Sequence, residues 1–144
     1  MTIKTMNYEL VEFIPEQLKD GILYISEPYK TAAHKCCCGC GEEVITPLNP
    51  TDWSVKFKDG RVSLSPSIGN WSFACRSHYW IRNGKVILSS DMSEEAIQRG
   101  RELDKQLKEQ YFSEINREKS PQPPTSLAAR IGQFFSMIKK LLGF

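Results

Sequence analysis

The chain has 144 residues, a formal net charge of +2, 40% hydrophobic and 25% charged residues. This length suits one ordinary domain with a core plus an appendage. The near-neutral charge, without a Gly-rich phosphate loop or a basic base-reading helix, argues against nucleic acid as a partner. The first residues contain no apolar run of signal-peptide length. No stretch reaches the roughly 18 to 20 apolar residues of a membrane-spanning helix. We therefore expect a cytoplasmic protein in a reducing compartment.

Residues 1–90 predict a small all-β unit with frequent turns. Residues 7–14 and 22–26 predict strands, the second because it is rich in β-branched and aromatic side chains. Residues 53–64 alternate apolar and polar positions around Asp59-Gly60, which predicts a hairpin.

The second half of this unit contains Pro66 and Gly69, which predict a loop or sharp turn over residues 66–71. Residues 72–81 predict a strand, and residues 82–84 predict a tight turn into an antiparallel partner at 85–90.

The character of the sequence changes at residue 91. Apolar residues at helical spacing among many charges predict a charged helix over 91–119, packing on or beside the β unit. Residues 120–126 are a proline-rich linker. Residues 127–144 predict a basic amphipathic helix, which could pack on the domain, self-associate, lie on a membrane or enter a partner's groove. The expected fold is therefore a small β-rich (α+β) protein: an antiparallel sheet, a helix, and a tethered C-terminal amphipathic helix.

Every cysteine and histidine falls into two clusters, HKCCCGC at residues 34–40 and CRSH at residues 75–78. An odd number of cysteines, four of them nearly contiguous, disfavours a disulfide framework. Thiolates are preferred ligands of Zn²⁺, which takes four ligands in a tetrahedral structural site. The spacing leaves the ligands of the metal open, because the first cluster offers two possible sets of cysteines. In addition, His34 or His78 could replace one sulfur, and such a site could keep a position for a bound water. The two sets are the C-x2-C pair Cys37 and Cys40, and the alternating Cys36, Cys38 and Cys40 of an extended segment that curls at Gly39, completed by Cys75.

A zinc ion held by sulfur alone leaves both histidines free for chemistry. A serine becomes a useful nucleophile only with a base in reach, normally histidine. Adjacent Ser77 and His78 point to opposite faces of a strand, which favours Ser67 or Ser65 as the partner of His78. Ser67 precedes Gly69 on a constrained turn, which can expose a hydroxyl and aim backbone amides at an oxyanion.

Several segments together resemble a small bacterial zinc-binding family of unknown function: GILYIS, TAAHKCCCGCG, TPLNPTDW, SLSPSIGNW and CRSHYWIRNGKV. The resemblance spans residues 8–90. Cys37 occupies a variable position of the family motif, so the resemblance implies Cys36, Cys38, Cys40 and Cys75 as ligands of a structural Zn²⁺. It also implies a place in bacterial ubiquitin-like conjugation operons with E1-like and E2-like proteins, and an antiviral role against phage.

The expected function is a serine-type peptidase, a hydrolase that trims or removes a ubiquitin-like protein at its C-terminal tail. Ser67 is the expected nucleophile and His78 the expected base, with Ser65, Ser77 and His34 as further candidates. Backbone amides near Gly69 would hold the oxyanion, and the lining residues would be Asn70, Trp71 and Arg76. One alternative is a zinc-dependent hydrolase with a histidine ligand and bound water. Another is a non-enzymatic zinc-binding adaptor that presents its C-terminal helix to a conjugation partner or membrane.

Overall fold

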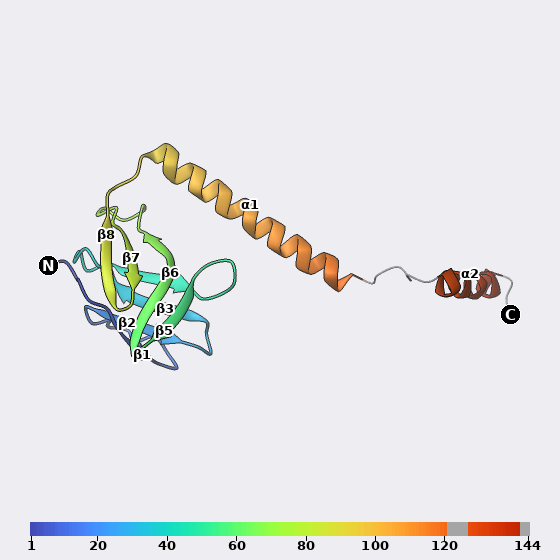
Figure 1. Ribbon diagram of the computed structural model, residues 1–144, viewed down its shortest axis with the longest axis horizontal. Helices are drawn as coiled ribbons and strands as arrows, with labels where there is room; N and C mark the ends of the chain where they lie inside the picture. Colours follow the sequence, from blue (N-terminus) through green and yellow to red (C-terminus); the bar gives the residue numbers. More distant parts are fainter. Residues whose placement is uncertain (121–126, 142–144) are drawn as a thin grey trace. The chain divides into compact units, whose positions relative to one another are not determined.

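The computed structural model describes residues 1–120 and 127–141 (Figure 1). Two compact units are distinguished, Met1–Asp104 and the part of the chain from Lys105 onward. The described secondary structure comprises these elements: β1 (Asn7–Leu10), β2 (Ile22–Ser26), β3 (Thr31–Lys35), β4 (Glu43–Pro47), β5 (Ser54–Lys58), β6 (Arg61–Gly69), β7 (His78–Arg82), β8 (Lys85–Ser89), α1 (Glu94–Lys119) and α2 (Leu127–Leu141).

The eight strands form two four-stranded sheets, ordered β1-β2-β3-β4 and β5-β6-β7-β8. Strands β1 and β2 are parallel, and every other neighbouring pair is antiparallel. The segment before β1 connects the sheets, because Thr5 forms a bridge with Lys85 at the edge strand β8. The Met6 amide donates to the Gly84 carbonyl at 2.9 Å.

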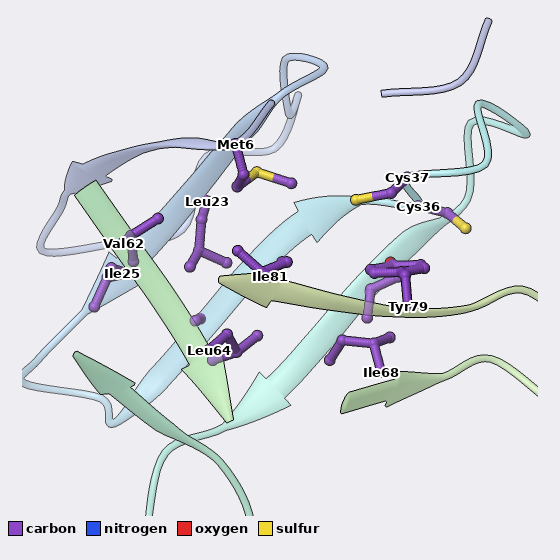
Figure 2. Packing of buried hydrophobic residues seen from close by; sticks show 12 residues of the cluster. Met6, Leu23, Ile25, Cys36, Cys37, Val62, Leu64, Ile68, Tyr79 and Ile81 are labelled. Atoms are coloured by element: carbon purple, nitrogen blue, oxygen red, sulfur yellow. The ribbon is translucent and has the colours of Figure 1, made fainter. Parts of the chain in front are cut away.

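The core lies between the two sheets. Strands β2 and β4 contribute Leu23, Ile25 and Val44, and strands β6 and β7 contribute Val62, Leu64, Ile68, Tyr79 and Ile81. Figure 2 shows these second-sheet side chains gathered with Met6, Cys36 and Cys37. Burying one such apolar side chain stabilises a fold by about 1.5–3 kcal/mol. Because side chains alternate along a strand, the inward Tyr79 and Ile81 leave His78, Trp80 and Arg82 on the outer face of the second sheet.

Several predictions from local sequence are confirmed. Strand β2 has the predicted bounds, and β5 and β6 form the predicted hairpin. Asp59 and Gly60 of its turn have φ of 50° and 70°, and Asn83 and Gly84 of the next turn have 48° and 72°. These left-handed conformations suit the Asx-Gly sequence of both turns.

Two predictions around the second cluster are wrong. Residues 66–71 were expected to be a loop, but β6 continues to Gly69, and the strand expected over 72–81 begins only at His78. Pro66 is accommodated because the β6–β7 register shifts between Leu64 and Ile68, and a proline is tolerated in such a bulge. Residues 70–77 form turns instead.

The strand expected over residues 7–14 ends at Leu10, and β3 and β4 were not predicted at all. Strand β3 is buried by tertiary packing, since Ala32 and Ala33 are fully covered on opposite faces of the first sheet. The fold class is nevertheless as expected, a β-rich unit followed by two helices.

Helix α1 begins three residues later than expected because Ser93 caps it. The Ala96 amide donates to Ser93 Oγ at 3.3 Å, which satisfies one of the free amides of the first turn. Ile97 is the buried residue of α1, whereas Leu103 and Leu107 are exposed. Packing of the whole helix on the β unit therefore stays a prediction.

Helix α2 has exposed apolar side chains at Ile131, Phe135, Met137 and Leu141, with Lys139 and Lys140 in its last turn. Residues 121–126 of the predicted linker, and residues 142–144, lie outside the described part of the chain. In the described part, neither helix is long and apolar enough to cross a membrane.

Candidate active site and metal centre

Ser67 and His78 meet on the outer face of the second sheet. Ser67 Oγ lies 3.0 Å from His78 Nε2, within hydrogen-bond distance. In the ladder, Leu64 pairs with Ile81 and Ile68 with Tyr79, so residues 65–67 together stand opposite Trp80 alone. Ser67 and Gly69 are two residues apart on β6, and Gly69 pairs with His78, so the Ser67 side chain lies on the same face as the His78 ring.

Two indoles pack against the His78 ring. Its centroid is 5.1 Å from that of Trp71 and 5.0 Å from that of Trp80. Its Nδ1 is buried and has no hydrogen-bond partner among the described residues, so no carboxylate orients the ring from behind. Both indoles are tilted against the imidazole, by 56° for Trp71 and 43° for Trp80. Packing against the two indoles therefore fixes the position of the ring.

Arg76 links Trp71 to acidic residues at and just before the start of α1. The Arg76 guanidinium lies 5.8 Å from the Trp71 ring centroid and forms ion pairs with Asp91 at 3.2 Å and Glu94 at 2.7 Å. Arg76 has a φ of 45°, an unfavourable conformation for a residue with a Cβ, which these contacts compensate.

Gly69 allows Trp71 to approach the backbone of β6. A Cβ on Gly69 would lie 2.5 Å from Trp71 Nε1, closer than real Cβ atoms come to other atoms. The glycine also pairs with His78 in the β6–β7 ladder. It is therefore required where the tryptophan folds back over the strand end.

A pocket of about 390 Å³ opens beside Ser67. Ser65 lines it as well, and Arg82 lies over the Trp80 ring at 5.5 Å from its centroid. The complete lining is Ser63, Leu64, Ser65, Pro66, Ser67, Trp80, Ile81 and Arg82. Two of the candidate serines thus border one pocket, and Ser67 is the one hydrogen-bonded to a histidine.

The four cysteines Cys36, Cys38, Cys40 and Cys75 form a cluster in which every sulfur lies within 4.8 Å of the others. The Cys36–Cys38, Cys36–Cys75 and Cys40–Cys75 sulfur separations are 3.5, 3.9 and 3.8 Å. Four sulfurs bound tetrahedrally to one Zn²⁺ at about 2.3 Å lie about 3.8 Å apart. The donor set and its spacing therefore fit a four-thiolate metal site.

The loop at Cys36–Cys40 is a turn, not the extended segment expected from alternation, although the predicted curl at Gly39 is present. Gly39 and Gly41 have φ of 90° and 88°, and the Cys36 amide donates to the Glu42 carbonyl at 2.8 Å. Cys37 points away from the cluster into the core, and Figure 2 shows its side chain and that of Cys36 leaving the chain on opposite sides. Burial raises the pKa of the Cys37 thiol to about 12, so it stays protonated.

A buried polar network lies behind the sulfur cluster. Ser77 Oγ lies 3.0 Å from Cys36 Sγ and 3.4 Å from Cys75 Sγ. Asn70 Nδ2 donates to Ser77 Oγ at 3.0 Å and to the Tyr79 hydroxyl at 3.4 Å. That hydroxyl is 2.8 Å from Nε2 of fully buried His34, and burial lowers the pKa of His34 to about 4, which keeps the ring neutral.

The structure thus divides the predicted site residues into two groups. The outer group contains Ser65, Ser67, Gly69, Trp71, Arg76 and His78, and the inner group contains the four cysteines with His34, Asn70 and Ser77. Tyr79, which joins the inner polar residues, was missed because its role depends on packing between the sheets. Its position directly after His78 was the available signal.

Both groups fall in a region that matches a known family. The family model of the bacterial ubiquitination-like system serine protease (BubE) matches residues 10–89, which is more than half of the chain. No curated protein and no solved structure is significantly similar to the chain. The chain therefore belongs to the BubE family of serine proteases of bacterial ubiquitination-like systems.

Proposed function

We propose that this chain hydrolyses the peptide or isopeptide bond that follows the C-terminal glycine of a ubiquitin-like protein. It would thereby mature a precursor or release the modifier from a target. Membership of the BubE family supports the reaction class. The observation that carries the residue assignment is the 3.0 Å contact between Ser67 Oγ and His78 Nε2.

In the first half of the reaction, Ser67 Oγ bonds to the carbonyl carbon of the glycine, and His78 Nε2 takes the hydroxyl proton. The resulting imidazolium contacts the Trp71 and Trp80 rings, whose π electrons would stabilise the positive charge as it forms. His78 then gives this proton to the leaving nitrogen as the carbon–nitrogen bond breaks. The product is an ester between the modifier and Ser67.

In the second half, a water molecule attacks the ester carbon and gives its proton to His78. The bond to Ser67 Oγ breaks, and the proton returns from His78 to that oxygen. The modifier leaves with a free C-terminal carboxylate. A serine–histidine dyad is sufficient for this sequence, and removing a third triad member from related enzymes lowers the rate without abolishing catalysis.

Zn²⁺ is the metal that suits the four-sulfur cluster, with Cys36, Cys38, Cys40 and Cys75 as its ligands. A closed four-thiolate site contributes folding energy and leaves no position for a reacting water. Neither histidine of the chain belongs to the cluster, since His34 contacts Tyr79 and His78 contacts Ser67. This arrangement favours a serine-type reaction over a zinc-dependent hydrolase.

One ligand of the metal site, Cys75, lies in the same segment of chain as residues near the proposed catalytic pair. Cys75 belongs to the turns over residues 70–77, which also contain Trp71 and Arg76. A metal that fixes Cys75 would therefore fix the segment whose indole packs on His78. The expected partners are the tail of the ubiquitin-like protein and the E1-like and E2-like proteins of its pathway.

A serine-reactive organophosphonate tests the assignment on the full, zinc-loaded chain. We expect one label on Ser67, located by mass spectrometry of the digested protein, and no label in Ser67→Ala. Ser65→Ala is the matched control, because Ser65 lines the same pocket, while the hydrogen bond to His78 is formed by Ser67. A label on another serine would overturn the residue assignment. Intact zinc-bound protein with neither label nor turnover would favour the adaptor alternative.

A further inference from the structure

The outer face of the second sheet becomes strongly basic at the end away from His78. Lys56 pairs with Ser63, Arg82 pairs with Lys85, and Lys58 pairs with Arg61 across the strand ladders. Residues paired directly opposite point to the same face, and so do residues two apart along a strand. The five cations, here called the basic rows, are Lys56, Lys58, Arg61, Arg82 and Lys85.

The two hairpins bring these cations together. The Leu64–Ile81 pair places Ser63 beside Arg82, and the Asn83 amide donates to Ser63 Oγ at 2.8 Å. The Gly84 amide donates to the Val62 carbonyl at 2.7 Å, next to Arg61. The basic rows are therefore one continuous surface over four strands.

The charge of the basic rows is not neutralised within the described residues. All five side chains belong to exposed residues, and none of the five forms a salt bridge with another described residue. Asp59, in the β5–β6 turn, is the acid that lies next to them in the sequence. Arg82 has a contact with the Trp80 ring, which leaves its outer N–H groups available.

The pocket beside Ser67 leads to this surface. Its lining follows β6 from Ser63, which lies beside Arg82, to Ser67, and contains no acidic residue. His78 and Arg82 are four residues apart on β7, which corresponds to about 13 Å of extended chain. A substrate strand of about four residues would therefore reach from the Ser67 hydroxyl to the basic rows.

We propose that the basic rows bind acidic side chains in the substrate's extended tail, about four residues before the bond that Ser67 cleaves. This inference rests on the proposed function. The tail on the amino-terminal side of the bond belongs to the modifier itself and recurs in every substrate, whereas the other side changes with the target. A basic surface can therefore contribute to substrate specificity only if it binds the amino-terminal tail, which is the same in every substrate.

The test measures binding apart from cleavage. Full-length, zinc-loaded Ser67→Ala protein is titrated into fluorescein-labelled peptides that contain one central glycine, and fluorescence polarisation gives Kd. One peptide has two glutamates about four residues before the glycine, one has glutamines there, and one has the glutamates after the glycine. We expect the first peptide to bind about tenfold more tightly than the second at low salt, and this difference to shrink at high salt.

Two variants with the same loss of charge locate the effect. In the Ser67→Ala background, Lys56→Gln, Arg82→Gln and Lys85→Gln together should reduce the glutamate preference to less than about twofold. Lys19→Gln, Lys35→Gln and Arg99→Gln, outside the second sheet, should leave it unchanged. Equal preference in both variants would overturn the proposal, and so would an advantage of glutamates after the glycine. Tighter binding of a single-stranded DNA oligomer than of the glutamate peptide at physiological salt would also overturn it.

Failure of this inference can be distinguished from failure of the proposed function. If the wild-type chain cleaves the glutamate and glutamine peptides equally well and binds them equally, the acidic preference is wrong and the peptidase assignment stands. The opposite outcome is that the chain shows the charge preference in binding and yet neither cleaves these peptides nor reacts with the organophosphonate. In that case the proposed binding role of the basic rows is supported, and the peptidase assignment is wrong.

Discussion

Ser67 and His78 are hydrogen-bonded across neighbouring strands, with 3.0 Å between Oγ and Nε2. Gly69 pairs with His78, and Ser67 lies two residues before Gly69 on β6, so the hydroxyl and the ring share the outer face of the sheet. The two residues are therefore positioned by neighbouring strands of one sheet, and they should act as one unit.

The first prediction concerns this unit. Ser67→Ala and His78→Gln should each lower kcat/KM for a modifier precursor by about 10³-fold or more, because either change removes the activated nucleophile. The double variant should be about as slow as either single variant. Steady-state kinetics on the three proteins checks this, with Ser65→Ala as the control of unchanged rate. A double variant whose loss is the product of the single losses would contradict a shared role.

The second prediction concerns the indoles beside His78. Trp80→Leu and Trp71→Leu should each lower kcat about 2- to 30-fold with little change in KM, because a cation–π contact contributes about 0.5–2 kcal/mol to the imidazolium. Phenylalanine keeps a π face, so Trp80→Phe should recover part of the rate. Equal kcat values for the leucine and phenylalanine variants would show that the rings act through packing alone. Thermal unfolding of each variant separates loss of stability from loss of rate.

Elements that depend on short-range sequence signals could be predicted, whereas elements that depend on packing between distant segments could not. The hairpins of the second sheet were predictable because Asp59-Gly60 and Asn83-Gly84 carry the turn chemistry within two residues. Strand β3 contains two alanines and only Thr31 as a β-branched residue, so its propensity is weak and packing on both faces makes it a strand.

The metal centre could likewise be predicted from local sequence, whereas the contacts of the buried histidine could not. Cysteines are scarce and soft, so four clustered thiols indicate a metal without knowledge of the fold. Contacts of His34 with Tyr79 exist only after the two sheets pack, and no spacing rule indicates them. The basic rows were equally hidden, because a net charge of +2 conceals them until strand register aligns Lys56 with Arg82.

The third prediction concerns Gly69. Gly69→Ala should lower kcat about tenfold, because the new Cβ must displace Trp71 from the strand end and thereby loosen the ring beside His78. The same overlap should cost about 1–3 kcal/mol in the free energy of unfolding. Gly100→Ala is the matched control, since a Cβ there meets no atom within 4 Å and alanine favours the helix by about 1 kcal/mol. The free energy of unfolding should therefore fall for Gly69→Ala and rise for Gly100→Ala, whereas the initial rate should fall for Gly69→Ala and stay unchanged for Gly100→Ala.

The fourth prediction concerns the metal. The purified chain should contain one Zn²⁺, and Cys40→Ser should lose it, while Cys37→Ser should retain it because Cys37 faces the core. Removal with a strong chelator should destabilise the fold by several kcal/mol, and activity should fall together with the circular dichroism signal. Elemental analysis and thermal unfolding measure both effects. Activity lost on mild chelation while the fold stays intact would indicate a reacting metal-bound water, and would overturn the dyad mechanism.

The fifth prediction separates Ser77 from Ser67. Ser77→Ala removes a hydroxyl that lies 3.0 Å from Cys36 Sγ and accepts from Asn70 Nδ2, so it should weaken zinc affinity about 10- to 100-fold. Once saturated with zinc, this variant should react with the organophosphonate at the wild-type rate, because Ser77 lies on the inner side of the sheet and Ser67 on the outer side. Competition with a zinc indicator gives the zinc affinity, and labelling kinetics give the rate of reaction with the organophosphonate. Loss of labelling in the zinc-saturated variant would instead assign the nucleophile to the inner group of residues.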